Sequence, residues 1–141
     1  MYEYKTKVIR IVDGDTVDFD LDLGIGIHAT DSGDGVHGFR CRLYGIDAPE
    51  SYGVKKDSEE YKKGIAAKEH LAELIEGKDV LVRTYKDSKG ARGRYLATIY
   101  VLSDEEWKRV AAHESRLAPI KSVNEMMVED GFAVPYFGGK R

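Results

Sequence analysis

Apolar residues occupy every second position between residues 16 and 23, where they alternate with threonine and aspartate. This period of two predicts a β-strand whose apolar side chains face a core. The acids Asp18, Asp20 and Asp22 are then predicted on a solvated face, and the alternation explains them without a metal. Segment 28–38 is rich in glycine, aspartate and serine and is predicted to be a loop. Similar apolar patterns predict four more strands, at residues 5–12, 40–46, 80–85 and 94–101.

Three helices are predicted from capping residues and apolar periodicity. Aspartate or serine followed by glutamate three residues later is typical of a helix start, and it occurs at 57–60, 103–106 and 122–125. Gly77 and Gly131 suit the ends of the first and third helices, because glycine adopts the left-handed conformation that often follows a helix. Five strands with helices after the third and the fifth predict an α+β fold.

The length and composition indicate a small soluble protein. A chain of 141 residues is predicted to form one domain, residues 1–141, and to be a monomer. Charged residues make up 33% of the chain, and no apolar run is long enough to span a membrane. The first residues lack the apolar segment of a signal peptide, so we expect a cytoplasmic protein. The single cysteine, Cys41, excludes an intrachain disulfide and is expected to be buried.

Two short segments combine the residue types that phosphodiester cleavage requires. Asp13 and Asp15 flank a glycine in a tight turn between the first two predicted strands. Asp47 and Glu50 follow the third predicted strand, which carries Arg42. Carboxylates bind hard cations and a guanidinium grips phosphate, and phosphodiester hydrolysis uses these groups together. The alternatives are acids that only stabilise turns and arginines that only form structural ion pairs.

Four motifs follow one another along residues 7–137. They are Asp13-Gly14-Asp15-Thr16; Arg42 with Asp47-Ala48-Pro49-Glu50; Gly93-Arg94-Tyr95-Leu96-Ala97; and Val123-Asn124-Glu125 with Gly131-Phe132-Ala133. In type and order these motifs resemble the staphylococcal nuclease (thermonuclease) family, and the compact chain resembles its phage and bacterial members. The resemblance implies a five-stranded Greek-key β-barrel (OB-fold) with about three helices. It also implies a calcium-dependent nuclease that hydrolyses DNA or RNA and leaves 3′-phosphate ends.

The resemblance also implies a metal site. Asp15, Asp47 and the backbone carbonyl of Ala48 are expected to bind Ca²⁺. Ala48 stands where the family has a threonine, but that position supplies its carbonyl oxygen, which alanine also has. Asp13 is expected to support these ligands without contacting the ion.

Two arginines and a glutamate complete the implied catalytic set. Arg42 and Arg94 are expected to bind the phosphate as negative charge develops on its oxygen atoms. Glu50 is expected to orient or deprotonate the attacking water. The spacing before the aspartate favours Arg42 over its neighbour Arg40, and the Gly-Arg-Tyr-Leu-Ala pattern favours Arg94 over Arg92.

Three further residues are candidates for substrate binding. Tyr85 and Tyr136 can stack on bases, although core packing is the alternative for both. Arg92 can replace the charge of a lysine that the family has before its Gly-Arg pair. The net charge of −3 is unusual for a nucleic-acid binder and leaves open a non-catalytic OB module that binds nucleic acid or a protein. Such modules usually lose the acids or arginines, and their presence here favours the enzyme.

Overall fold

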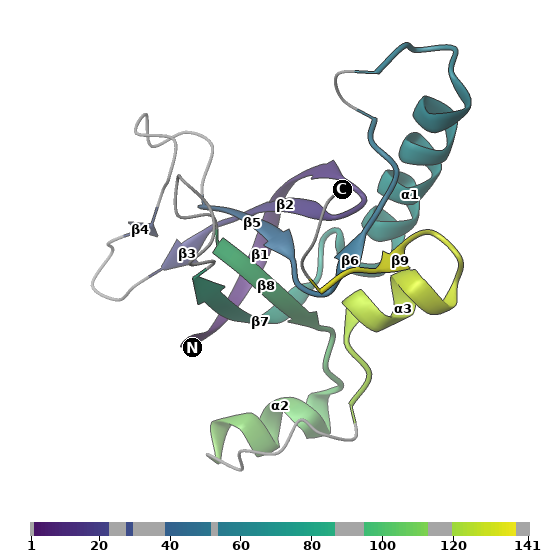
Figure 1. Ribbon diagram of the computed structural model, residues 1–141. Helices are drawn as coiled ribbons and strands as arrows, with labels where there is room; N and C mark the ends of the chain where they lie inside the picture. Colours follow the sequence, from purple (N-terminus) through teal and green to yellow (C-terminus); the bar gives the residue numbers. More distant parts are fainter. Residues whose placement is uncertain are drawn as a thin grey trace.

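The computed structural model describes residues 2–22, 28–29, 39–51, 54–86, 95–112 and 120–137 (Figure 1). Along the chain these residues form β1 (Tyr2–Asp13), β2 (Thr16–Phe19), β3 (Leu21–Asp22), β4 (His28–Ala29), β5 (Phe39–Leu43), β6 (Ile46–Asp47), α1 (Glu59–Ile75), β7 (Asp79–Lys86), β8 (Tyr95–Tyr100), α2 (Asp104–Ala111), α3 (Val123–Glu129) and β9 (Val134–Pro135). None of the helices in this described part of the chain has the length and apolar character needed to cross a membrane.

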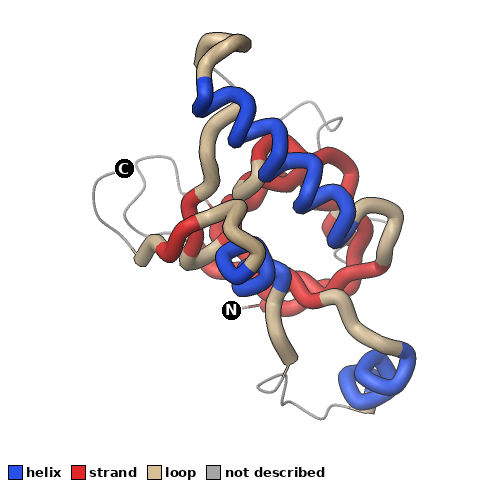
Figure 2. Tube along the Cα trace, turned by 90° about the vertical axis from the view of Figure 1, so that its right-hand side faces the viewer, coloured by secondary structure: helices blue, strands red, loops and turns tan. Residues whose placement is uncertain are grey.

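Five strands close into a barrel in the order β1-β2-β5-β8-β7. All neighbours are antiparallel except β5 and β8, which are parallel. Counted along the chain, the barrel strands are therefore arranged first, second, third, fifth, fourth, and the barrel closes between the fourth and the first. This confirms the predicted α+β fold with a five-stranded OB-type barrel and three helices. Figure 2 shows the strands as a ring, with the long helix α1 lying across it.

The core fills the barrel and the space beneath two of the helices. Phe19 and Ile99 are fully buried inside the barrel, Leu71 and Ile75 close it from α1, and Met127 closes it from α3. Burial of each of these large side chains contributes roughly 1.5–3 kcal/mol. Cys41 is fully buried on β5, as predicted. The core therefore fixes α1 and α3 relative to the strand ends that they cover.

The helix boundaries agree with the predicted signals except at the start of α1. Ser58, not Asp57, is the N-cap of α1, and its hydroxyl accepts a hydrogen bond from the backbone N–H of Tyr61. The capping box predicted at 57–60 was therefore wrong: the helix begins one residue later, and its third residue is Tyr61, which has no carboxylate to complete a box. The capping boxes predicted for α2 and α3 are present. Gly77 and Gly131 follow their helices with φ of +74° and +83°.

The strand predicted at 16–23 is interrupted at Asp20. Its first half is β2 in the barrel, and Leu21–Asp22 form β3, which pairs with His28–Ala29 in a separate two-stranded sheet. The predicted loop at 28–38 therefore begins with a short strand, and residues 30–38 lie outside the described part of the chain. A two-residue strand is too short to show a period, so no apolar pattern predicts it.

Asp18 was predicted on a solvated face, and this was wrong. Its side chain is only 1% exposed and forms two hydrogen bonds with Arg40, at 2.8 and 3.1 Å. Arg40 is the direct cross-strand partner of Asp18 between β2 and β5. A carboxylate can be buried when a guanidinium pairs with it bidentately, and alternation along one strand does not reveal such a partner.

The Asp18–Arg40 pair predicts a clear stability effect. Arg40→Ala should leave a buried carboxylate unpaired and lower the free energy of unfolding by about 2–4 kcal/mol. Lys121→Ala is the control, because it breaks an exposed pair with Glu129 and should have a much smaller effect. Chemical denaturation followed by circular dichroism measures both. Equal effects of the two variants would show that the buried pair does not stabilise the fold.

Candidate active site

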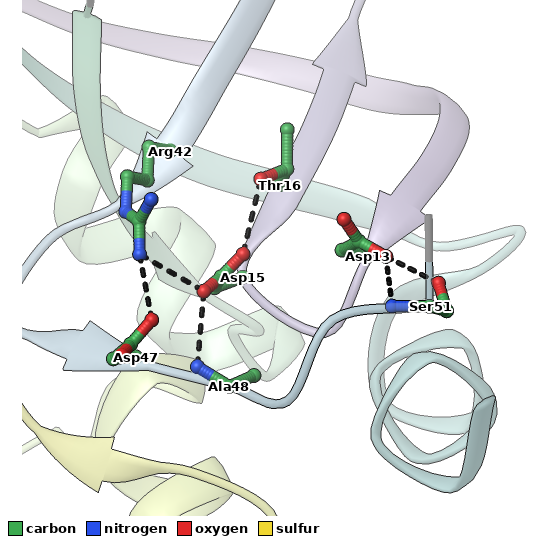
Figure 3. A network of polar contacts seen from close by, with 7 residues as sticks. All are labelled: Asp13, Asp15, Thr16, Arg42, Asp47, Ala48 and Ser51. Carbon is green, nitrogen blue, oxygen red and sulfur yellow. Dashed lines mark hydrogen bonds and ion pairs between the residues drawn. The ribbon is translucent and has the colours of Figure 1, made fainter. Parts of the chain in front are cut away.

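The side chain of Arg42 joins two carboxylates that are distant in sequence (Figure 3). Its Nη2 donates to Asp15 Oδ2 at 3.1 Å and to Asp47 Oδ1 at 2.9 Å. The Arg42 side chain is 14% exposed, that of Asp15 is 9% exposed and that of Asp47 is 32% exposed. The predicted residues therefore meet at one place, which is closed on the Asp15 side and open to solvent on the Asp47 side.

Backbone pairing explains why these side chains converge. Thr16 is the cross-strand partner of Arg42, and Leu43 N–H donates to the carbonyl of Asp15 at 2.7 Å. Gly45, with φ of +80°, then turns the chain between β5 and β6, which brings the next segment back over Asp15. There the backbone N–H of Ala48 donates to Asp15 Oδ2 at 2.9 Å. Asp15 is thus the acceptor that connects the first turn to the segment after β6.

Asp13 holds a different part of the same segment. Its Oδ1 accepts hydrogen bonds from both the backbone N–H of Ser51, at 3.1 Å, and the Ser51 hydroxyl. Asp13 is therefore hydrogen bonded to the end of the 47–51 segment, and Asp15 is hydrogen bonded to its beginning (Figure 3). Asp13 is thus hydrogen bonded to Ser51, and its supporting role in the site stays a prediction.

Two glycines allow the close packing of these segments. A Cβ on Gly14 would lie 2.6 Å from the Cβ of Ala67 on α1 and 3.0 Å from that of Ala48. Gly64 lies in the interior of α1, where glycine costs about 1 kcal/mol relative to alanine. A Cβ there would lie 2.5 Å from the carbonyl carbon of Glu50. Helix α1 therefore packs directly on the backbone of both site segments.

Burial and neighbouring negative charges both disfavour the charged forms of Asp47 and Glu50. Partial burial raises the pKa of the Asp47 carboxyl; Arg42 opposes this shift and the Asp15 carboxylate adds to it. Partial burial also raises the pKa of Glu50, and the negative charges of Asp13 and Asp15 raise it further. The site therefore carries more negative charge than Arg42 alone offsets, and it would be stabilised by a cation.

The donor set fits a hard cation that completes its shell with water. Within the residues that the structure describes, no group of three or more His, Cys, Asp or Glu side chains lies close enough to hold a metal ion. Asp15 and Asp47 nevertheless converge on a single nitrogen of Arg42, so their oxygen atoms lie within reach of one point. Ca²⁺ takes about six to eight oxygen ligands, including backbone carbonyls and water. Two carboxylates, the carbonyl of Ala48 and water suit this ion and do not suit zinc.

The other predicted residues are only partly placed. Arg94 and Arg92 lie outside the described residues. Arg40, the alternative to Arg42, is paired with Asp18 instead. The backbone N–H of Tyr136 donates to the carbonyl of Gly45 at 2.8 Å, which continues the β6–β9 pairing beside the site.

An aromatic cluster lies near Tyr85 and was not predicted. The rings of Tyr44 and Tyr85 are 5.3 Å apart, and those of Tyr44 and Phe137 are 6.1 Å apart. Tyr44 is 45% exposed and Phe137 is 77% exposed, so both rings are accessible to a ligand. Tyr44 is two residues after Arg42, so the alternation of the predicted strand puts both side chains on one face. The position of Phe137 depends on the pairing of β6 with β9.

A groove of about 680 Å³ opens beside the carboxylates. One wall is the segment from Asp47 to Glu50, another comes from α1, and the third is the turn between α3 and β9. Its lining residues are Asp47, Ala48, Pro49, Glu50, Val54, Glu60, Lys63, Gly131, Phe132, Ala133 and Val134. A ligand that approaches Asp47 and Glu50 therefore has space on this side of the barrel.

The barrel and the acid–arginine cluster together define an OB-fold protein with a charged site at one edge. The family model of staphylococcal nuclease homologues matches residues 40–141. The chain therefore belongs to the staphylococcal nuclease homologue family. A comparison with curated proteins found no match. The matched range contains Arg42, Asp47 and Glu50 but begins after Asp15, so Asp15 joins the site through the three-dimensional structure.

The raised pKa of Glu50 predicts a pH-dependent gain in stability for Glu50→Gln. An acid whose pKa is raised in the folded state destabilises the fold when it is charged. In the absence of divalent cations, Glu50→Gln should therefore raise the melting temperature at pH 7. The gain should disappear as the pH falls below the ordinary carboxyl pKa, because the wild-type glutamate is then neutral too. Thermal melts in chelator at several pH values measure this.

Glu69→Gln, on the exposed side of α1, is the control for the loss of one negative charge. A melting temperature at pH 7 that falls in Glu50→Gln, or rises equally in the control, would contradict the electrostatic account of the site.

Proposed function

We propose that the protein is a calcium-dependent nuclease that hydrolyses phosphodiester bonds of DNA or RNA and leaves 3′-phosphate ends. The observation that carries this proposal is the contact of one Arg42 nitrogen with both Asp15 and Asp47. Membership in a nuclease family supports it. Two carboxylates from distant segments around one largely buried guanidinium bring together the groups that a cation–phosphate site uses.

The charge of the site explains the proposed need for a cation. Asp15, Asp47 and Glu50 would repel a phosphodiester; the pKa values of Asp47 and Glu50 are raised first by partial burial and further by the neighbouring acids. Asp15, Asp47 and the carbonyl of Ala48 would hold Ca²⁺, which neutralises charge on the phosphate oxygens. The net charge of −3 of the whole chain then does not prevent local binding of a nucleic acid.

Arg42 is positioned to grip the phosphate. Its Nη2 is fixed by two carboxylates, so the guanidinium plane is oriented before substrate arrives. Its Nε is buried, and none of the described residues accepts a hydrogen bond from it. A guanidinium can bind two oxygens of one phosphate. Arg94, by its sequence motif, would bind the same phosphate.

Glu50 would act on the attacking water. Its carboxylate lies at the groove, and its raised pKa makes it a better proton acceptor than an ordinary glutamate. As the water oxygen bonds to phosphorus, its proton passes to Glu50 or to solvent. The bond from phosphorus to the 5′-oxygen breaks, and that oxygen takes up a proton. The phosphate then remains on the 3′-oxygen of the other product.

The bases of the substrate would bind to the aromatic cluster. The exposed rings of Tyr44 and Phe137, with Tyr85 behind them, offer faces on which bases can stack. Arg92 and Tyr136 remain predicted contacts from the sequence. Stacking is tolerant of sequence and sugar, which suits activity on both DNA and RNA.

The main test is digestion of single-stranded DNA and of RNA by the purified protein. We expect cleavage with Ca²⁺ and none with chelator, and products with 3′-phosphate ends by mass spectrometry. Asp47→Ala should lose activity at low Ca²⁺ because one cation ligand is removed. Asp104→Ala, at an exposed position in the first turn of α2, should retain it.

Equal digestion with Ca²⁺ and with chelator would show that cleavage does not depend on a divalent cation. Binding of nucleic acid without cleavage under any condition would favour the non-catalytic OB module instead.

The two arginines predict a second result. Arg42→Ala and Arg94→Ala should each reduce kcat by about 10²-fold or more, as loss of a preorganised donor does. Lysine should not restore kcat at either position, because it lacks the planar fork of the guanidinium. Arg92→Ala is the control on the same segment and should raise KM more than it lowers kcat. If Arg94→Ala keeps a near-normal kcat and Arg92→Ala loses it, then Arg92 and not Arg94 is the arginine that binds the phosphate.

A further inference from the structure

Gly64 stands where helix α1 meets the backbone of the site. It lies in the interior of α1 and is buried there, although glycine is among the poorest helix formers. A Cβ at this position would collide with the carbonyl oxygen of Glu50, would lie 2.5 Å from the carbonyl carbon and would lie 2.7 Å from the backbone nitrogen of Ser51. These atoms form the peptide unit between Glu50 and Ser51. Only glycine lets that peptide unit approach the helix so closely.

The same peptide unit is held from its other side by Asp13. The Ser51 N–H donates to Asp13 Oδ1 at 3.1 Å, and the Ser51 hydroxyl donates to the same oxygen. The carbonyl side of the peptide thus packs on Gly64 while its N–H side is hydrogen bonded to the first turn. Neither contact involves the cation ligands Asp15 and Asp47.

The side chain of Glu50 depends on this backbone. No hydrogen bond or ion pair to another described residue holds its carboxylate, which is exposed. The position of the carboxylate is therefore set by where the 50–51 peptide lies and by the fields of Asp13, Asp15 and Arg42. A displacement of the peptide by about 1 Å would carry the carboxylate with it, and misplacement on this scale can cost about 10²-fold in rate.

We propose that Gly64 is a positioning residue for Glu50, and that its missing Cβ sets the distance between α1 and the water-activating carboxylate. This inference rests on the proposed nuclease function. It adds to that function a residue of α1 that packs against the backbone of the site. The alternative is that Gly64 serves packing and stability alone.

The test is Gly64→Ala, assayed on single-stranded DNA with Ca²⁺. The added methyl group must displace the Glu50–Ser51 peptide or the helix, so kcat should fall about tenfold or more. KM and the Kd for Ca²⁺, measured by calorimetry, should stay within about twofold, because Asp15, Asp47 and Arg42 are not contacted. Gly77→Ala is the matched control. It strains a φ of +74° just beyond the same helix, where a Cβ would meet no atom within 4 Å. It should lower stability and leave kcat unchanged.

A double-mutant cycle with Glu50→Gln separates positioning from packing. If Gly64 acts through Glu50, Gly64→Ala should cost little further kcat in the Glu50→Gln background. Equal losses in both backgrounds, or a normal kcat in Gly64→Ala, would overturn the inference while the nuclease function stands. Absence of cleavage by the wild-type protein would overturn the nuclease function first, and the inference with it.

Ser51→Ala provides a second variant in case Gly64→Ala does not fold. It adds no volume and removes the hydroxyl contact with Asp13, so it loosens the other side of the same peptide. We expect a severalfold fall in kcat that is again absent in the Glu50→Gln background. A loss that persists in that background would contradict the proposal.

Discussion

The structure of the site depends on the hydrogen bonds that Asp15 accepts from two different segments. Arg42 reaches it from β5, and the backbone N–H of Ala48 reaches it from the segment after β6. Because Asp15 is almost fully buried, its charge requires these donors. The same bonds bring Asp47 beside Arg42 and leave Glu50 three residues further along the groove. One buried carboxylate thus determines where the rest of the charged cluster lies.

The barrel and α1 support this arrangement in different ways. Pairing of β2 with β5 fixes the register of Thr16 against Arg42, so the arginine is presented at the strand end nearest Asp15. Helix α1 packs on the site from behind through its smallest residues, which allow backbone to approach backbone. The more hydrophobic half of α1, with Leu71 and Ile75, lies in the core. The helix therefore stabilises the barrel at one end and shapes the site at the other.

Much of the fold and the centre of the site could be predicted from the sequence, and the failures have physical causes. Alternation and capping residues are local signals, and they identified the barrel strands and three helices. Burial of Asp18 depends on Arg40, a cross-strand partner that no pattern within one strand reveals. The role of Gly64 depends on a contact with Glu50 across space, and a glycine inside an apolar helix pattern gives no hint of its partner. Contacts between residues that are distant in the chain therefore could not be predicted from local sequence patterns.

The central claim is that Asp15, Asp47 and Arg42 form one site for a cation and a phosphate. A crystal structure of the protein with Ca²⁺ and a short single-stranded oligonucleotide carrying non-bridging phosphorothioates would test it most directly. We expect anomalous density for the ion between Asp15 and Asp47, with a phosphate group bound to the guanidinium of Arg42. An ion bound elsewhere, or a phosphate bound away from Arg42 while Arg42 still bridges both aspartates, would contradict the account.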